Sequence, residues 1–129
     1  MRIQVRSQDD IRVCSVAGEL DAYTAPELRD ALDAVLAEGQ ATIIVDLREL
    51  TYLDSTGLGI LVGTAKKARH AGGDLAVCCT RPNLLKIFQI SGTHEILNLQ
   101  PTLDEAAERI RQLRDSRGQS EGDAPGKGS

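Results

Sequence analysis

Polar and apolar residues alternate through the first seventeen positions of the chain. Ile3 and Val5 lie between polar neighbours in residues 2–6, and residues 11–17 again place every second side chain on an apolar face. A period of two is typical of β-strands that bury one face. Residues 8–10, Gln-Asp-Asp, form a turn sequence between the two stretches. The pattern therefore predicts an antiparallel hairpin.

The spacing of apolar residues then changes to three and four, which predicts helices. A first helix begins near Thr24, where Thr24 and Glu27 match a capping box and Pro26 fits the first turn, and it ends at Gly39. Three further helices are predicted, from Ser55 to about residue 71, from Pro82 to Gly92, and from Thr102 onward.

Two near-continuous apolar runs, residues 42–47 and 75–79, are typical of central strands covered on both faces. Residues 96–99 are predicted as a short strand. Strands that alternate with helices imply crossover units and a largely parallel sheet. The fold class is therefore α/β: one domain over residues 1–114, with a mixed, mostly parallel sheet, an N-terminal antiparallel hairpin and four to five helices. Residues 115–129 carry almost nothing apolar and are predicted to be a disordered polar tail.

Composition narrows the classes of function. The chain has a net charge of −4 and only 2% aromatic residues, so the basic, aromatic-rich surface of a nucleic-acid-binding protein is not expected. It has no apolar run that could cross a membrane and no signal peptide, which predicts a cytoplasmic protein without a membrane partner. Cys14, Cys78 and Cys79 are predicted to be free, buried thiols. With His70 and His94 they give no familiar zinc spacing, so neither a metal nor a cofactor is expected.

The predicted helix from Ser55 has an unusual face. Ser55, Gly59, Gly63 and Lys67 are four residues apart and so form one row along the helix. Two glycines inside a helix cost about 1 kcal/mol each relative to Ala. Two interpretations follow: a flat strip on which a partner docks, with Ser55 at its head, or close packing of the glycines against the protein's own interior.

Ser55 itself is ambiguous on local grounds. Asp54, Ser55 and Thr56 can each cap the start of a helix, and a serine at this point is usually only a cap. One cap is sufficient, so at least one of the three side chains is free to face solvent.

Several segments, in order, carry a resemblance to a known family. Residues 18–25, Val45-Asp46-Leu47, residues 53–59 (Leu-Asp-Ser-Thr-Gly-Leu-Gly), Gly72-Gly73 and residues 84–92 resemble the STAS-domain family of anti-sigma factor antagonists. The resemblance spans about residues 2–111, nearly the whole chain that is predicted to be ordered.

The resemblance implies a phosphorylation switch. In the family, the unphosphorylated antagonist binds an anti-sigma factor that is also a serine kinase and so releases the sigma factor. Phosphorylation of the serine corresponding to Ser55 ends that binding, and a serine phosphatase resets the switch. The predicted partner-binding residues are Asp21, Tyr23, Thr24, Asp54, Ser55, Thr56, Gly57, Gly59, Gly63, Lys67, Ile87 and Ile90.

Some roles within this set stay open. Asp21 and Asp54 either help to position the kinase's Mg-nucleotide or the serine hydroxyl, or only form a turn and a cap. Thr56 is a helix-start residue or a second phosphorylation site. Oligomeric state is open between a monomer and a weak dimer.

Two other functions compete with this one. A STAS protein can serve as a signalling scaffold, or as the partner of a kinase and phosphatase pair that does not act on a sigma factor. An enzyme is the third class. The pattern Gly-x-Ser-x-Gly occurs at residues 118–122, but in the polar tail, without the strand and helix that a nucleophile elbow requires. No catalytic residue is predicted.

Overall fold

The structure is a computed structural model that describes residues 1–127, with side chains as far as Ser116. Within these residues it contains five strands and four helices. In chain order they are β1 (Arg2–Gln8), β2 (Ile11–Leu20), α1 (Ala25–Ala37), β3 (Thr42–Asp46), β4 (Leu50–Leu53), α2 (Ser55–His70), β5 (Asp74–Cys78), α3 (Pro82–Ser91) and α4 (Leu103–Lys127).

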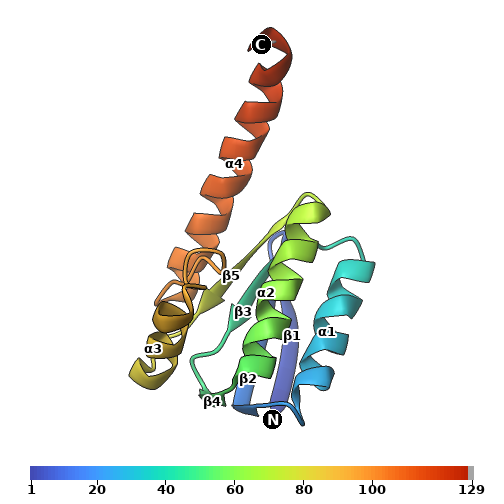
Figure 1. Ribbon diagram of the computed structural model, residues 1–129. Helices are drawn as coiled ribbons and strands as arrows, with labels where there is room; N and C mark the ends of the chain where they lie inside the picture. Colours follow the sequence, from blue (N-terminus) through green and yellow to red (C-terminus); the bar gives the residue numbers. More distant parts are fainter. Residues whose placement is uncertain (128–129) are drawn as a thin grey trace.

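The strands form one mixed sheet between two layers of helices. The order is β1-β2-β3-β5, and β4 pairs with β2 beyond the end of β3. Strands β1 and β2 are antiparallel, whereas β2, β3, β4 and β5 pair in parallel. Helices α1 and α2 lie side by side on one face, and α4 crosses the other (Figure 1). The predicted hairpin and the mostly parallel sheet are confirmed.

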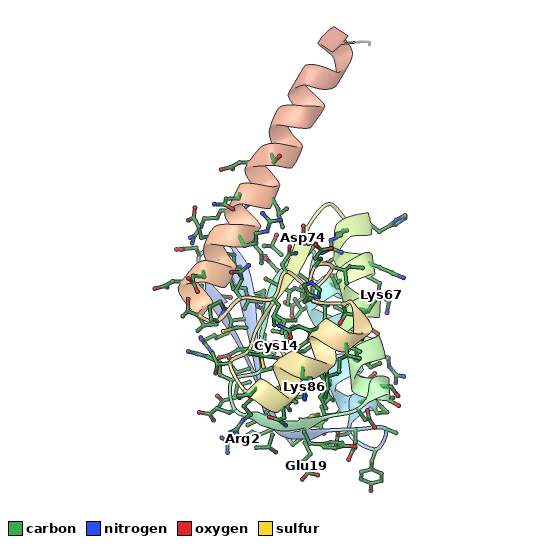
Figure 2. All side chains as sticks on the ribbon, turned by 60° about the vertical axis from the view of Figure 1, so that its left-hand side comes forward. Arg2, Cys14, Glu19, Lys67, Asp74 and Lys86 are labelled. Carbon is green, nitrogen blue, oxygen red and sulfur yellow. The ribbon has the colours of Figure 1, made fainter. Side chains whose placement is uncertain are left out.

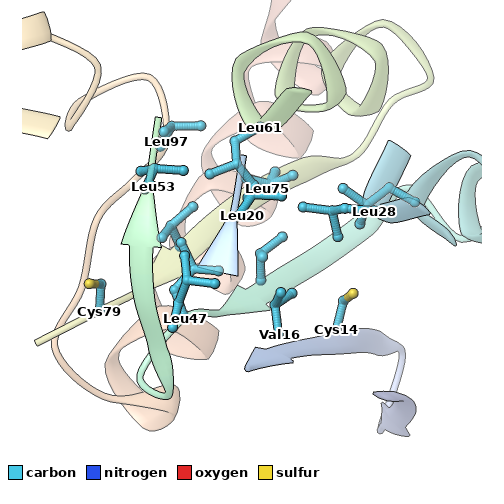
Figure 3. Packing of buried hydrophobic residues seen from close by; sticks show 14 of the residues in the cluster. Cys14, Val16, Leu20, Leu28, Leu47, Leu53, Leu61, Leu75, Cys79 and Leu97 are labelled. Carbon is cyan, nitrogen blue, oxygen red and sulfur yellow. The ribbon is translucent and has the colours of Figure 1, made fainter. Parts of the chain in front are cut away.

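Two apolar clusters hold these layers together. The larger lies between the sheet and the layer of α1, α2 and α3, where Leu20, Leu28, Leu61 and Leu75 meet (Figure 3). The smaller lies under α4, where Ile110 covers the opposite face of the sheet. Every residue of β3 and β5 is buried because both faces are covered, as their apolar runs predicted.

The predicted strand over residues 96–99 is wrong. Residues 94–98 form turns, and the chain meets the sheet only at Gln100, in an isolated bridge to Cys78. Asn98 has a positive φ of 49°, which an extended strand does not allow. Its buried side-chain amide donates to the Leu75 carbonyl oxygen over 2.9 Å, so the turn is fixed against β5 by a side chain.

The end of the described chain is helical. Residues 115–127, predicted as part of a disordered tail, continue helix α4, whose last turns extend beyond the sheet in Figure 1. Residues 128 and 129 lie outside the described residues. The division into a domain of residues 1–114 and a tail stays a prediction.

The three cysteines are buried and free, as predicted. Burial raises the pKa of Cys14 and of Cys78 to about 11, so both thiols stay protonated near neutral pH.

Candidate functional site

Helix α2 begins at Ser55 and is capped by the residue before it. Asp54 has an extended backbone, and its Oδ1 accepts a hydrogen bond from the Gly57 N–H over 3.0 Å. The side chains of Ser55 and Thr56 are exposed, and neither hydroxyl takes part in a hydrogen bond within the described residues. Asp54 therefore does the capping, and the Ser55 hydroxyl is available to solvent.

The second oxygen of Asp54 positions the loop between β2 and α1. Asp54 Oδ2 accepts from the Ala22 N–H over 3.0 Å, and the Asp54 N–H donates to the Leu20 carbonyl oxygen over 3.2 Å. These contacts place the segment of Asp21 and Tyr23 beside the start of α2. Tyr23 is 93% exposed there. Asp21 thus lies in a loop that is hydrogen-bonded directly to Asp54 through Ala22.

The loop is held by its own side chains. Asp21 Oδ1 accepts from the backbone N–H groups of Tyr23 and Thr24, both at 3.0 Å. The Thr24 N–H, with the Thr24 hydroxyl and the Tyr23 N–H, lowers the pKa of Asp21, so this carboxylate is ionised at neutral pH.

The capping box predicted for Thr24 and Glu27 does not form. Thr24 is the N-cap of α1, but its hydroxyl makes no capping hydrogen bond. It points back into the loop, where it donates to the Glu19 carbonyl oxygen over 2.9 Å and accepts from the Asp21 N–H over 2.9 Å. Thr24 therefore shapes the loop beside Ser55.

The row along α2 faces outward. Ser55, Gly59 and Lys67 are exposed and Gly63 is half-buried. A Cβ atom added at Gly59 or Gly63 would meet no atom within 4 Å, so the interpretation that these glycines pack against the interior is wrong. Lys67, labelled in Figure 2, is held by an ion pair of 3.0 Å between its Nζ and Asp33 Oδ1 of α1.

Gly57 differs from the other two glycines. It is buried, and a Cβ atom there would lie 2.6 Å from Leu20 Cγ and 3.0 Å from Leu53 Cδ1. Its predicted place on the partner surface is therefore corrected: Gly57 lets the first turn of α2 pack against the ends of β2 and β4.

An apolar groove adjoins Ser55 on the side that faces helix α3. Ile87 and Ile90 of α3 line it opposite Leu53 and Leu58. Ile90 is 79% exposed and Ile87 is half-buried, whereas Phe88 between them is fully buried. Two of these residues, Leu53 and Leu58, were missing from the predicted surface. Leu58 packs partly against the core and is only half-buried, since it also lines the groove.

Within residues 1–116, no group of three or more His, Cys, Asp or Glu side chains is placed to hold a metal ion. None of the helices in the described part of the chain combines the length and the apolar character needed to cross a membrane.

Comparison with known proteins adds to this geometry. A family model for the STAS domain matches residues 2–106. The anti-sigma-B factor antagonist of Bacillus subtilis is 39% identical over 94 residues, which cover 73% of this chain and 84% of that protein.

Solved structures of anti-sigma factor antagonists superpose on this chain. An anti-sigma factor antagonist from Mycobacterium paratuberculosis superposes with a TM-score of 0.79 at 33% identity, over 85% of this chain and 93% of that one. The Bacillus cell fate determinant SpoIIAA in its phosphorylated form superposes with a TM-score of 0.66 at 25% identity, over 84% and 99% of the two chains.

Proposed function

The chain belongs to the STAS domain family, and from this premise we propose that it is an anti-sigma factor antagonist switched off by phosphorylation of Ser55. In the unphosphorylated form it binds an anti-sigma factor that is also a serine kinase, and the sigma factor is released. A serine phosphatase restores the binding form. The proposal includes a cytoplasmic location.

One observation carries the choice of Ser55. Its hydroxyl is exposed and makes no hydrogen bond within the described residues, because Asp54 already caps the helix. A kinase can therefore modify Ser55 without removing a contact on which the fold depends. The start of a helix also tolerates an anion well, since unpaired N–H groups and the helix dipole favour negative charge there.

Phosphorylation should weaken binding to the partner and leave the fold intact. Phosphorylation adds a charge of about −1.5 to −2. The carboxylates of Asp54 and Asp21 lie on the same surface, so the added charge meets like charge once a partner excludes water from it. A penalty of about 3–4 kcal/mol weakens binding roughly 100- to 1000-fold. The partner surface we propose combines the loop with Tyr23, the outward row of α2, and Ile87 and Ile90.

Two substitutions at Ser55 test the switch. Ser55→Ala removes the phosphate acceptor, so we expect constitutive binding of the anti-sigma factor. Ser55→Asp should lose most of that affinity while melting within about 0.5 kcal/mol of the wild type, as surface substitutions usually do. Calorimetric titration with candidate anti-sigma factors, together with thermal denaturation, measures both effects.

Thr56 provides the matched control, because its hydroxyl is also exposed and one residue away. Thr56→Ala and Thr56→Asp should leave the switch working, and mass spectrometry after incubation with the kinase and ATP should locate the phosphate on Ser55. A phosphate on Thr56, or a large loss of stability in Ser55→Asp, would contradict the proposal.

A further inference from the structure

A polar pocket of about 400 Å³ lies at the end of β3, away from the surface around Ser55. The side chains that matter in its lining are Arg2, Gln4, Ser15, Asp46, Arg48 and Glu49. Gln4, Ser15 and Asp46 are paired across β1, β2 and β3, so they form one row on one face of the sheet. Helix α4 covers the apolar part of that face, at Val13 and Ile44, whereas Gln4 is exposed and Ser15 half-buried in the polar row.

The sheet topology explains why the pocket forms here. Strand β2 pairs with β3 as far as Ser15 and Asp46, and it pairs with β4 only from Gly18 and Leu50 onward. The loop of residues 47–49 bridges the interval. It is fixed by two backbone hydrogen bonds, Leu47 N–H to the Cys78 carbonyl oxygen at 2.8 Å and Gly18 N–H to the Glu49 carbonyl oxygen at 3.2 Å. A preformed crevice at the carboxyl end of a parallel strand is where open α/β sheets bind ligands.

Apart from the Glu49 carboxylate, the polar groups of the pocket that lack a partner within residues 1–116 are mainly hydrogen-bond donors. Within residues 1–116, the side chains of Arg2 and Gln4 take part in no hydrogen bond or ion pair. Ser15 Oγ accepts from Arg6 Nη1 over 3.0 Å and retains its own proton to donate. Such a set of donors matches an anion with several oxygens.

The acidic residue at the centre of the row is already neutralised. Arg48 Nε and Nη2 donate to Asp46 Oδ1 and Oδ2, each over 2.9 Å, which leaves Arg48 Nη1 unused. Burial acts to raise the pKa of Asp46, but the hydrogen bonds from Arg48 outweigh it and lower the pKa, so the pair is ionic. Among the lining residues, Arg2 and Arg48 balance the charges of Asp46 and Glu49. Arg6, which donates to Ser15 beside the pocket, brings the local charge to +1.

We propose that this pocket binds the phosphate group of a small phosphorylated metabolite, through Arg2, Arg48, Gln4 and Ser15. Guanidinium groups match phosphate oxygens in charge and in geometry. The lining contains no aromatic side chain on which a base could stack, which favours a polyol phosphate over a nucleotide. This site is separate from the switch at Ser55. The two are close in sequence, since only the four residues of β4 separate Glu49 from Asp54.

Titration with glycerol 3-phosphate, followed in ¹H–¹⁵N spectra of the full chain, tests the proposal. We expect saturable shifts at the amides of Ser15, Ala17, Arg48 and Glu49. Arg2→Gln should raise the dissociation constant about tenfold, because one charge-assisted contact is lost. Arg29→Gln, an exposed arginine of α1 on the opposite layer, is the control and should change nothing.

Glycerol and malonate complete the test. Neither should compete with glycerol 3-phosphate, since the first lacks the anion and the second lacks the tetrahedral group. Absent or scattered shifts, identical behaviour of the two arginine variants, or equal binding of malonate would each overturn the proposal. No anti-sigma factor enters the experiment, so its outcome is independent of the switch at Ser55.

Discussion

The two ends of helix α2 use polar side chains in opposite ways. At the start, Asp54 caps the helix and also accepts from the Ala22 N–H of the neighbouring loop, and the Ser55 and Thr56 side chains stay exposed. At the other end, Arg69 Nε donates to Asp74 Oδ1 over 2.9 Å, and Asp74, labelled in Figure 2, is almost completely buried.

The buried end is part of a network that joins four segments. Arg69 Nη2 donates to the Ile96 carbonyl oxygen, Asn98 Nδ2 lies 3.4 Å from Asp74 Oδ1, and Arg109 Nε of α4 lies 3.4 Å from Asn98 Oδ1. One end of α2 is thus fixed by buried polar contacts, and the other leaves its side chains exposed to solvent. Stability and binding should therefore respond to different residues of the same helix.

The largest loss of stability should come from the buried end. Arg69→Ala removes a charged partner of a buried carboxylate, and we expect the free energy of unfolding to fall by about 3 kcal/mol. Urea denaturation measures the change. Lys66→Ala, on an exposed neighbouring turn, is the control and should cost less than about 0.5 kcal/mol. Equal losses in the two variants would remove the distinction between the ends.

Gly57→Ala should come next, because it inserts a methyl group where Leu20 and Leu53 already pack. Overpacking of this kind costs about 1–3 kcal/mol. The same urea experiment tests it, and a variant as stable as the wild type would show that Leu20 can move aside.

Asp54→Ala should cost about 1 kcal/mol, the usual effect of losing a helix cap. It also removes the acceptor of the Ala22 N–H, so hydrogen exchange at the Ala22 amide should accelerate. Ser55→Ala should leave that exchange rate unchanged. An unaltered rate in Asp54→Ala would mean that the loop is held by Asp21 and Thr24 alone.

The smallest effect on stability should occur at Gly59. Gly59→Ala fills open space on a helix and should stabilise the fold by about 0.5–1 kcal/mol. If a partner docks closely on the row, the same methyl group should weaken binding of the anti-sigma factor. Unchanged affinity in both Gly59→Ala and Gly63→Ala would place the partner elsewhere on the molecule.

Periodicity predicted much of the fold. The apolar runs of β3 and β5 and the glycine that ends α3 identified their elements without any tertiary information. Strand β4 was missed because it has only four residues, with Leu50 and Leu53 buried and the two between them exposed, which is no strand period. Residues 96–99 were wrongly predicted as a strand because three of the four are apolar, but the contact of Asn98 with β5 fixes a turn.

The site was predictable in outline but not in its contacts. Spacing placed Ser55, Gly59 and Gly63 in one row, yet it could not say which side of the helix would be covered. Whether Gly57 or Gly59 lies inside depends on Leu20, which is distant in sequence. The ion pair of Lys67 with Asp33 depends likewise on how α1 packs beside α2. The partner-binding roles of these residues stay predictions.

The paired hydrogen bonds of Asp54 also constrain how this protein can diverge. One carboxylate accepts hydrogen bonds from two segments, at Ala22, which is 32 positions before Asp54, and at Gly57, three positions after it. A change in the length of the first loop would remove one of these donors and disturb the second segment as well. The side chains of Tyr23 and Thr56 make no hydrogen bonds that link two segments of the described chain. Duplicated copies in one cell could therefore acquire separate partners by exchanging those exposed residues, while the frame that presents the serine stays the same.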